Sequence, residues 1–195
     1  MHSIIVGTEG KVSSGIPKVA AGIPVGEPPT SLIFLHASAK AAANRESYRL
    51  MWDQEDTADL LGWYEVVYED GFVITIPIRY GVNILEWNWA QRVHKNNGNQ
   101  GGYCYGADAI AVGGGTNNRI IFFAFEWTKP RLGKVIQEIR LKGTAGFRGA
   151  PARLINDYGP VIENNAVILK AISMVQKRAD TIRCWNAPCS VPQDS

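Results

Sequence analysis

The sequence predicts an all-β fold, a jelly-roll β-sandwich, on three observations. Its 195 residues include 20 Gly and 10 Pro, which suit a chain of many turns better than one of long helices. Short runs of β-branched and aromatic residues recur between the turn-forming residues. A polar, Gly-rich stretch at residues 90–106 is typical of an exposed loop that projects from a rigid frame.

The clearest element is a β-hairpin, with one strand at Trp63–Tyr68 and a return strand at Phe72–Ile78. Between them, Glu69-Asp70-Gly71 supplies the turn, because Gly tolerates the positive φ that tight hairpin turns need. The Asp-Gly pair between two such runs is a strong short-range hairpin signal.

The return strand of this hairpin has two different faces. Alternation places Ile74, Ile76 and Ile78 on one face, and Val73, Thr75 and Pro77 on the other. Pro77 has no N–H to donate to a neighbouring strand, so we expect this strand to lie at a sheet edge or to be bulged there.

Further strands are expected on both sides of the hairpin. They lie at Ile4–Val6, Leu32–Leu35, Asp108–Val112, Arg119–Trp127, Val135–Leu141 and Ala166–Val175. The apolar run Leu32–Leu35 is typical of a strand covered on both faces, and His36 at its end is expected to bond to the backbone. Ala166–Val175 lacks helical spacing, so a strand is favoured over a helix. Residues 16–25 predict an extended connection instead.

The chain length indicates one domain with a core of its own. We expect the sandwich to span residues 1–176 and residues 177–195 to form a C-terminal tail. Residues 113–118, Gly-Gly-Gly-Thr-Asn-Asn, lack the Gly-Lys-Ser/Thr pattern of a nucleotide loop and are interpreted as a turn.

The charge distribution excludes some classes of partner. The formal net charge is +2 and the Lys and Arg residues are scattered, so no nucleic-acid partner is expected. No stretch approaches the roughly 20 apolar residues that a membrane span requires. The N-terminus lacks a charged-then-apolar signal, which predicts either a cytoplasmic protein or one whose signal has been removed.

Metal and disulfide chemistry are weakly indicated. Four carboxylates cluster at Asp53, Glu55, Asp56 and Asp59, but without the Asp-x-Asp-x-Asp-Gly spacing, so a solvated loop is favoured and structural calcium is the alternative. Cys184 and Cys189 are close enough for a small disulfide loop in an oxidising compartment; free thiols are the other interpretation. No histidine stands beside them, so zinc is not expected.

Several motifs follow one another along the chain. They are Ile23-Pro24-Val25-Gly26, Ser31-Leu32-Ile33-Phe34-Leu35-His36-Ala37, Tyr64-x-Val66-x-Tyr68-x-Asp70-Gly71, Ile76-Pro77-Ile78-Arg79-Tyr80-Gly81-x-Asn83-Ile84-x-x-Trp87 and Trp127-x-Lys129-Pro130. In this order, together with the strand that carries Ile136, Ile139 and Leu141, they resemble a galactose-binding-like β-sandwich module. Such modules are found beside glycoside hydrolase and related catalytic domains in bacteria. The resemblance spans roughly residues 16–175, and none of its motifs is a catalytic signature.

The resemblance implies a galactose-binding-domain-like jelly roll that acts as a non-catalytic accessory module. Its ligand would be a polysaccharide or oligosaccharide, and its partner a catalytic domain in the same or another chain. It also implies an extracellular or periplasmic location. No cofactor is expected.

Sugar recognition needs aromatic faces and planar polar side chains, which the loops of this chain supply. The candidate ligand-binding residues are Trp52, Arg79, Trp87, Trp89, Tyr103 and Tyr105. On an extended segment Trp87 and Trp89 would point the same way and form a platform, although Trp87 is also expected to cap the core. Asn83 is expected either to bond a ligand or to be buried in a structural role, and the same alternatives hold for Arg79.

An enzyme is not favoured. The chain has no Gly-x-Ser-x-Gly elbow and no His-Glu-x-x-His motif. A glycosidase needs two carboxylates across a cleft, and no pair can be argued from spacing; Glu65 and Glu69 belong to hairpin positions that normally face water. The alternatives to a carbohydrate-binding module are therefore a structural or protein-interaction domain without sugar affinity and, less favoured, an uncharacterised hydrolase.

Overall fold

The structure is a computed structural model that describes residues 3–7, 15–25, 28–40, 60–90, 104, 106–115, 118–144 and 165–176. These residues form nine β-strands. The strands are β1 (Ile4–Gly7), β2 (Val19–Ile23), β3 (Ser31–Ser38), β4 (Leu60–Tyr68), β5 (Val73–Arg79), β6 (Ala107–Gly113), β7 (Ile120–Thr128), β8 (Ile136–Gly143) and β9 (Ala166–Val175). The all-β prediction is confirmed for this part of the chain. Within it, no helix is long and apolar enough to cross a membrane.

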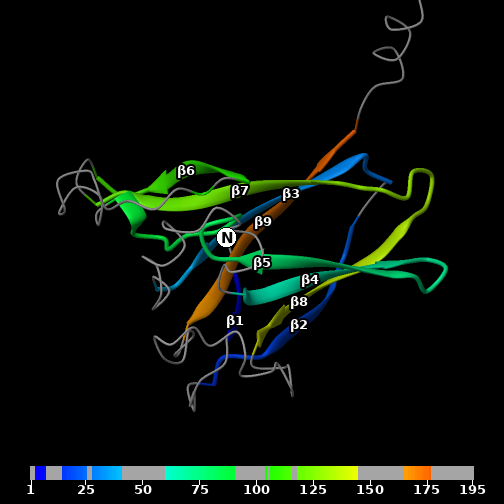
Figure 1. Cartoon of the computed structure of the whole chain (residues 1–195), viewed down its shortest axis with the longest axis horizontal. Coiled ribbons are helices and arrows are strands. Elements are labelled where there is room, and N and C mark those ends of the chain that lie inside the picture. The colour runs from blue at the N-terminus through cyan, green and yellow to red at the C-terminus, as the bar shows by residue number, and fades with distance from the viewer. Residues whose placement is uncertain are drawn as a thin grey trace, which may run out of the picture.

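The strands form two sheets that pack face to face (Figure 1). One sheet has five strands in the order β1-β9-β3-β7-β6, and the other has four in the order β2-β8-β4-β5. Neighbouring strands in both sheets run antiparallel. This arrangement confirms the predicted β-sandwich.

The core lies between β3 and β4, the central strands that face one another. Leu32 and Phe34 of β3 point inward, and Tyr64, Val66 and Tyr68 of β4 do the same; all five are fully buried. The rings of Phe34 and Tyr64 stack with 4.1 Å between their centroids. Aromatic rings bury large apolar areas and stack in preferred geometries, so this pair fixes how the sheets lie against each other.

The predicted hairpin is confirmed as β4 and β5. The N–H of Tyr68 donates to the carbonyl of Phe72, and the N–H of Gly71 donates to the carbonyl of Tyr68, both at 2.9 Å. Gly71 has a φ of 79°, the left-handed conformation that closes a three-residue hairpin loop. Pro77 is exposed on β5, which is an edge strand as predicted.

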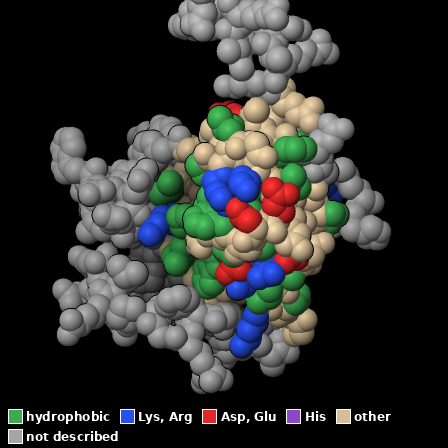
Figure 2. Space-filling model, turned by 90° about the vertical axis from the view of Figure 1, so that its right-hand side faces the viewer, with side chains coloured by type: hydrophobic (Ala, Val, Ile, Leu, Met, Phe, Trp, Pro, Cys, Tyr) green, Lys and Arg blue, Asp and Glu red, His purple; other side chains and the backbone are tan. Residues whose placement is uncertain are grey.

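A charged and aromatic contact ties this hairpin to the connection between β7 and β8. The Arg131 guanidinium donates to both carboxylate oxygens of Asp70, at 2.9 and 2.8 Å, and lies 4.5 Å from the ring centroid of Phe72 and 5.0 Å from that of Tyr68. These hydrogen bonds hold the pKa of Asp70 below its usual value. Figure 2 faces this end of the molecule, where basic and acidic side chains lie side by side among hydrophobic ones.

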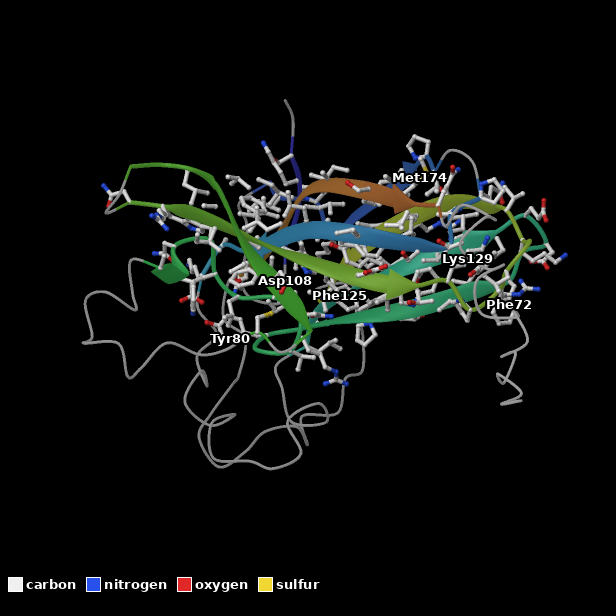
Figure 3. All side chains as sticks on the ribbon, turned by 90° about the horizontal axis from the view of Figure 1, so that it is seen from above. Phe72, Tyr80, Asp108, Phe125, Lys129 and Met174 are labelled. Carbon is white, nitrogen blue, oxygen red and sulfur yellow. The ribbon has the colours of Figure 1, made fainter. Side chains whose placement is uncertain are left out.

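A buried lysine stands beside this contact. Lys129 is 1% exposed, and its ammonium group donates to the carbonyl of Lys134. Burial lowers the pKa of Lys129, and the charge of Glu69 partly offsets this effect. Figure 3 shows Lys129 and Phe72 at this end of the sandwich, away from Tyr80 and Asp108.

Several elements differ from the predicted ones. Residues 19–23, expected as part of an extended connection, form strand β2, which pairs with β8 and is bulged between Ala20 and Ile23. Strand β3 continues past His36 to Ser38. Ile33 and Leu35 are only half-buried, so β3 is covered more completely on its core face than on the other. Ala166–Val175 is a strand, as favoured from its alternation.

We predict that Gly62→Ala lowers the free energy of unfolding by about 2 kcal/mol or more. A Cβ at Gly62 would lie 2.3 Å from the backbone carbonyl oxygen of Lys142, which is closer than van der Waals contact allows. Because β4 and β8 are paired at this point, the backbone of one strand would have to shift. Urea unfolding followed by circular dichroism measures the change. The matched control is Gly115→Ala, where an added Cβ meets nothing within 4 Å; equal stability losses in the two variants would contradict the packing argument.

Candidate functional site

Besides the contact between Arg131 and the hairpin end, polar and aromatic side chains of the described residues gather in two places. The first is the outer surface of the four-stranded sheet, which we call the β4–β8 face. It is formed by Trp63, Glu65, Thr75, Pro77, Glu138, Arg140 and Lys142. The second is the stretch after β5, which we call the 80–90 segment. We describe the β4–β8 face first, because its side chains stand on regular strands.

Strand alternation builds the β4–β8 face. Because Tyr64 and Val66 point into the core, Trp63 and Glu65 point outward. The register of the sheet then sets Trp63 between Pro77 of β5 and Lys142 of β8. Glu65 lies in the next row of the same face, between Thr75 of β5 and Arg140 of β8. Residues directly opposite on neighbouring strands have Cβ atoms roughly 5 Å apart, so these two rows form one continuous surface.

A chain of ion pairs orders the charged side chains of this face. Glu65 accepts hydrogen bonds from Lys142 Nζ at 2.6 Å and from the indole Nε1–H of Trp63 at 3.3 Å. Arg140 lies between two carboxylates: its Nη1 is 3.8 Å from Glu65 Oε2, and its Nε–H donates to Glu138 Oε1 at 2.6 Å. The other oxygen of Glu138 accepts the backbone N–H of Gly22 at 2.8 Å.

These contacts keep Glu65 ionised. Partial burial by itself raises the pKa of its carboxyl, but the hydrogen bonds from Lys142 and Trp63 and the positive charges of Lys142 and Arg140 outweigh it, so the pKa is lowered. A carboxyl with a lowered pKa holds no proton at neutral pH. Glu65 is therefore unsuited to act as a general acid, whereas it can accept hydrogen bonds from a ligand.

At the 80–90 segment, a fully buried histidine is held by two hydrogen bonds. The ring nitrogens of His36 lie 2.9 Å from the Tyr64 hydroxyl and 2.8 Å from the Asn83 carbonyl oxygen. A carbonyl only accepts, so Nε2 carries the proton and Nδ1 accepts from Tyr64. Burial lowers the pKa of His36 to about 4, although the bond to Asn83 opposes this. The prediction that His36 bonds to backbone is confirmed.

Two further buried polar groups of this segment also bond within the protein. The Tyr80 hydroxyl donates to Glu86, whose side chain is almost fully buried. The Asn83 amide accepts the N–H of Arg79 and donates to the Pro77 carbonyl, each at 2.9 Å. These contacts support the buried structural role that was one of the two expectations for Asn83.

Backbone bonds attach the 80–90 segment to β3 and β7. Ser38 donates its N–H to the Leu85 carbonyl and accepts the N–H of Trp87 at 3.0 Å, while Trp87 accepts the N–H of Ile121 at 2.8 Å. The indole N–H of Trp87 donates to the Ala39 carbonyl at 3.1 Å. Trp87 thus attaches this segment to two neighbouring strands of the five-stranded sheet. Trp89, which was expected to be the more exposed of the two, packs against the core cluster.

The residues predicted to bind ligand are only partly brought together. Trp87 lies in a turn and Trp89 is helical, so the extended geometry assumed for a two-ring platform is not present. Trp89 is half-buried and meets the ring of Phe123 edge-on, with 6.3 Å between centroids. Arg79 is half-buried at the end of β5. Trp52, Tyr103 and Tyr105 lie outside the described residues.

The main residues that the sequence analysis missed as binding candidates are Trp63, Arg140 and Lys142. Trp63 was assigned to the hairpin without a choice of face. The alternation of β4 contained the signal, since Trp63 is out of phase with Tyr64, Val66 and Tyr68. Arg140 and Lys142 alternate in the same way with Ile139 and Leu141, but their position beside Trp63 depends on the register between β4 and β8.

Sulfur and metal chemistry receive little support in this part of the chain. The Cys104 thiol lies 3.4 Å from the Val82 carbonyl oxygen, and burial raises its pKa to about 12, so it is protonated at neutral pH. Among the described residues, no three His, Cys, Asp or Glu side chains are grouped to hold a metal ion. The acidic residues 53–59 and both Cys184 and Cys189 lie outside the described residues, so the calcium and disulfide expectations stay predictions.

Comparison with known proteins identified no relative of this chain. The scan of protein-family models and the searches of curated proteins and of solved structures found no match for this chain. The functional argument therefore rests on the site itself.

We predict that the free energy of unfolding falls by about 2 kcal/mol between pH 6.5 and pH 5 because of His36. Its pKa is lowered from 6.5 to about 4 on folding, so below pH 6.5 the unfolded chain takes up a proton that the folded chain does not. The stabilisation is complete above pH 6.5 and is lost as the pH falls toward 4.

Urea unfolding at a series of pH values measures this change. His36→Gln should flatten the pH dependence between pH 6.5 and pH 5. A ring-carbon NMR titration of the native protein reports on His36 directly, without a substitution. A native midpoint near 6.5 would contradict the assignment.

Proposed function

We propose that the protein is a non-catalytic carbohydrate-binding module with a galactose-binding-like jelly-roll fold, and that the β4–β8 face is its binding surface. In this role it serves a bacterial glycoside hydrolase or another polysaccharide-degrading protein, outside the cytoplasm. The observation that carries the proposal is the outward Trp63 ring, set between Pro77 and Lys142 and beside a row of paired charged groups.

The strand order supports the jelly-roll part of the proposal. With β6 set aside, the two sheets have the strand orders β1-β9-β3-β7 and β2-β8-β4-β5, and the chain crosses between them at every connection except the β4–β5 hairpin. The first and last strands pair, and each inner strand pairs with at least one strand that is distant in the sequence. Two interleaved Greek keys produce this kind of order. In this interpretation β6 is an added edge strand.

The chemistry of the β4–β8 face suits a sugar chain. A pyranose ring presents a flat patch of C–H groups, which packs on an indole face, and a rim of hydroxyl groups, which both donate and accept hydrogen bonds. Around Trp63, Lys142 and Arg140 offer donors, while Glu65 offers an ionised acceptor. Because these charged groups hold one another in place, little side-chain entropy is lost when a ligand binds.

The buried polar groups support a non-catalytic role. His36 with Tyr64, and Tyr80 with Glu86, bond to each other inside the fold. A catalytic acid, base or nucleophile must instead reach a substrate, and the pKa of Cys104 is moved away from the range in which a thiol acts as a nucleophile.

A protein-interaction domain without sugar affinity is the second candidate. It is favoured by neighbouring apolar side chains on the edge strand β6, where Ile110 is 42% and Val112 40% exposed. Exposed apolar groups that cluster on one surface are typical of interaction sites.

We predict that the full chain binds a polysaccharide and that Trp63→Ala weakens this binding roughly 30-fold, the effect of losing about 2 kcal/mol from a central aromatic contact. Affinity gel electrophoresis against a panel of plant, algal and host polysaccharides, with and without calcium, measures retardation. Because Trp63 points out of the core, its truncation leaves the inward packing of β4 intact.

Two control variants locate the binding surface. Phe72→Ala removes an aromatic ring that is 52% exposed at the hairpin end and should leave retardation unchanged. Trp89→Ala tests the 80–90 segment. Loss of binding in Trp89→Ala but not in Trp63→Ala would place the binding site away from the β4–β8 face. If no polysaccharide retards the wild-type protein, the proposal of a carbohydrate-binding module is overturned in favour of the protein-interaction domain.

A further inference from the structure

Strand β6 leaves one side of the five-stranded sheet open. Among the described residues it pairs with β7 alone, and it stands last in the strand order (Figure 1). Residues 108–113 are all exposed, and Ile110 and Val112 are 42% and 40% exposed. A sheet edge presents unpaired N–H and C=O groups that can pair with another strand.

The other three sheet edges carry features that hinder strand pairing. β5 contains Pro77, which lacks a backbone donor. β2 is bulged between Ala20 and Ile23, and the N–H of Gly22 within that bulge already donates to Glu138. β1 has only four residues. Bulges, prolines and short length are the devices that prevent edge-to-edge association.

β6 has none of these devices over its first five residues. Its sequence, Ala-Asp-Ala-Ile-Ala-Val-Gly, contains no Pro, no Lys and no Arg, and Asp108 is its single charge. The pairing with β7 is regular from Ala107 to Ala111, and the register shift comes after Ala111. This leaves five consecutive residues with small or apolar side chains, apart from Asp108. At the first of them, Ala107, the backbone also bonds to the Cys104 thiol.

We propose that a second copy of this chain pairs with β6 in antiparallel fashion, about a two-fold axis at Ala109, so that two five-stranded sheets join into one. Ala109 then faces Ala109 of the partner, Ala107 faces Ala111, and Asp108 faces Ile110. This register uses the regular part of the strand and keeps the two Asp108 carboxylates from lying opposite each other. Because each copy uses the same edge, the assembly closes at two.

The choice of a second copy rests on the self-complementary sequence of β6. Small alanines alternate with Asp108 and Ile110, so the same five residues fit each other when they run in opposite directions. Asp108, on the outer surface of the sheet near the Tyr80 end of the molecule (Figure 3), would lie beside Ile110 of the partner. The pairing adds backbone hydrogen bonds and covers the exposed part of Ile110 from both copies.

A charge substitution at residue 110 tests both the dimer and its register. The full chain is examined by sedimentation velocity from about 1 to about 500 µM, a range suited to an interface of small area. The wild type should shift toward twice the 21.4 kDa of the chain. Ile110→Asp puts a second carboxylate opposite Asp108 of the partner and should weaken dimerisation at least tenfold, whereas I110K puts a positive charge there and should preserve the dimer.

The matched control is Val73→Asp on the edge strand β5, because Val73 is 42% exposed, as is Ile110. It should dimerise as the wild type does. A wild type that is monomeric throughout the concentration range would overturn the proposal. So would equal dissociation of Ile110→Asp and I110K, since simple loss of an apolar patch would affect both alike, and so would dissociation of Val73→Asp to the same extent.

A disulfide test reports on the register without disturbing the charges. Under oxidising conditions Ala109→Cys should form a disulfide with its own copy across the two-fold axis, because directly opposite residues have Cα atoms roughly 5 Å apart. Ala111→Cys, on the same face of the same strand, lies opposite residue 107 and should not. Mass spectrometry of non-reduced peptides identifies the linkage, and a linkage at residue 111 in place of 109 would overturn the proposed pairing.

Discussion

The contact between Phe34 of β3 and Tyr64 of β4 is the interaction on which the rest of this structure depends. The stacked rings join the central strand of one sheet to a central strand of the other, and the Tyr64 hydroxyl also bonds to His36. Once Tyr64 points inward, alternation obliges Trp63 and Glu65 to point outward. A slip of one residue would exchange the two sets, burying a carboxylate and exposing the core side chains. The same alternation along β4 therefore sets both which side chains form the core and which form the proposed binding surface.

The same contact explains why the polar residues of the interior are structural. His36 reaches from β3 to Tyr64 on one side and to the Asn83 carbonyl on the other, so it connects both sheets to the 80–90 segment. An unpaired polar group at such a position would cost about 1–3 kcal/mol. Hydrogen bonds among buried groups fix the path of an irregular segment that no regular strand pairing could define.

The edges of the two sheets differ in a way that has physical consequences. Each of three edges has a bulge, a proline or a short strand. Among the described residues, β6 pairs on one side alone, is regular over residues 107–111 and carries Asp108 as its one charge. The proposed binding surface and the proposed dimer edge belong to different sheets. Joining two copies through β6 therefore makes no use of the β4–β8 face, and the two functions are physically compatible.

The sequence by itself determined the all-β class, the β4–β5 hairpin with its Asp70-Gly71 turn, and the edge position of β5. These features depend on neighbours in the chain: turn chemistry, alternation and the missing N–H of Pro77. It also predicted that His36 bonds to backbone, but not that the partner is Asn83. Strand β2 escaped prediction because its Pro- and Gly-rich surroundings resemble a connection, and its pairing with β8 involves residues more than a hundred positions away.

Only the tertiary structure decided which residues form the candidate site. Trp63, Arg140 and Lys142 come from strands far apart in the sequence, and their proximity depends on the register between β4 and β8. In the same way, Trp87 lost the expected strand geometry because its segment turns to bond with β3 and β7. Side-chain alternation is a local property that a sequence displays, whereas strand partners are chosen by the burial of the whole core.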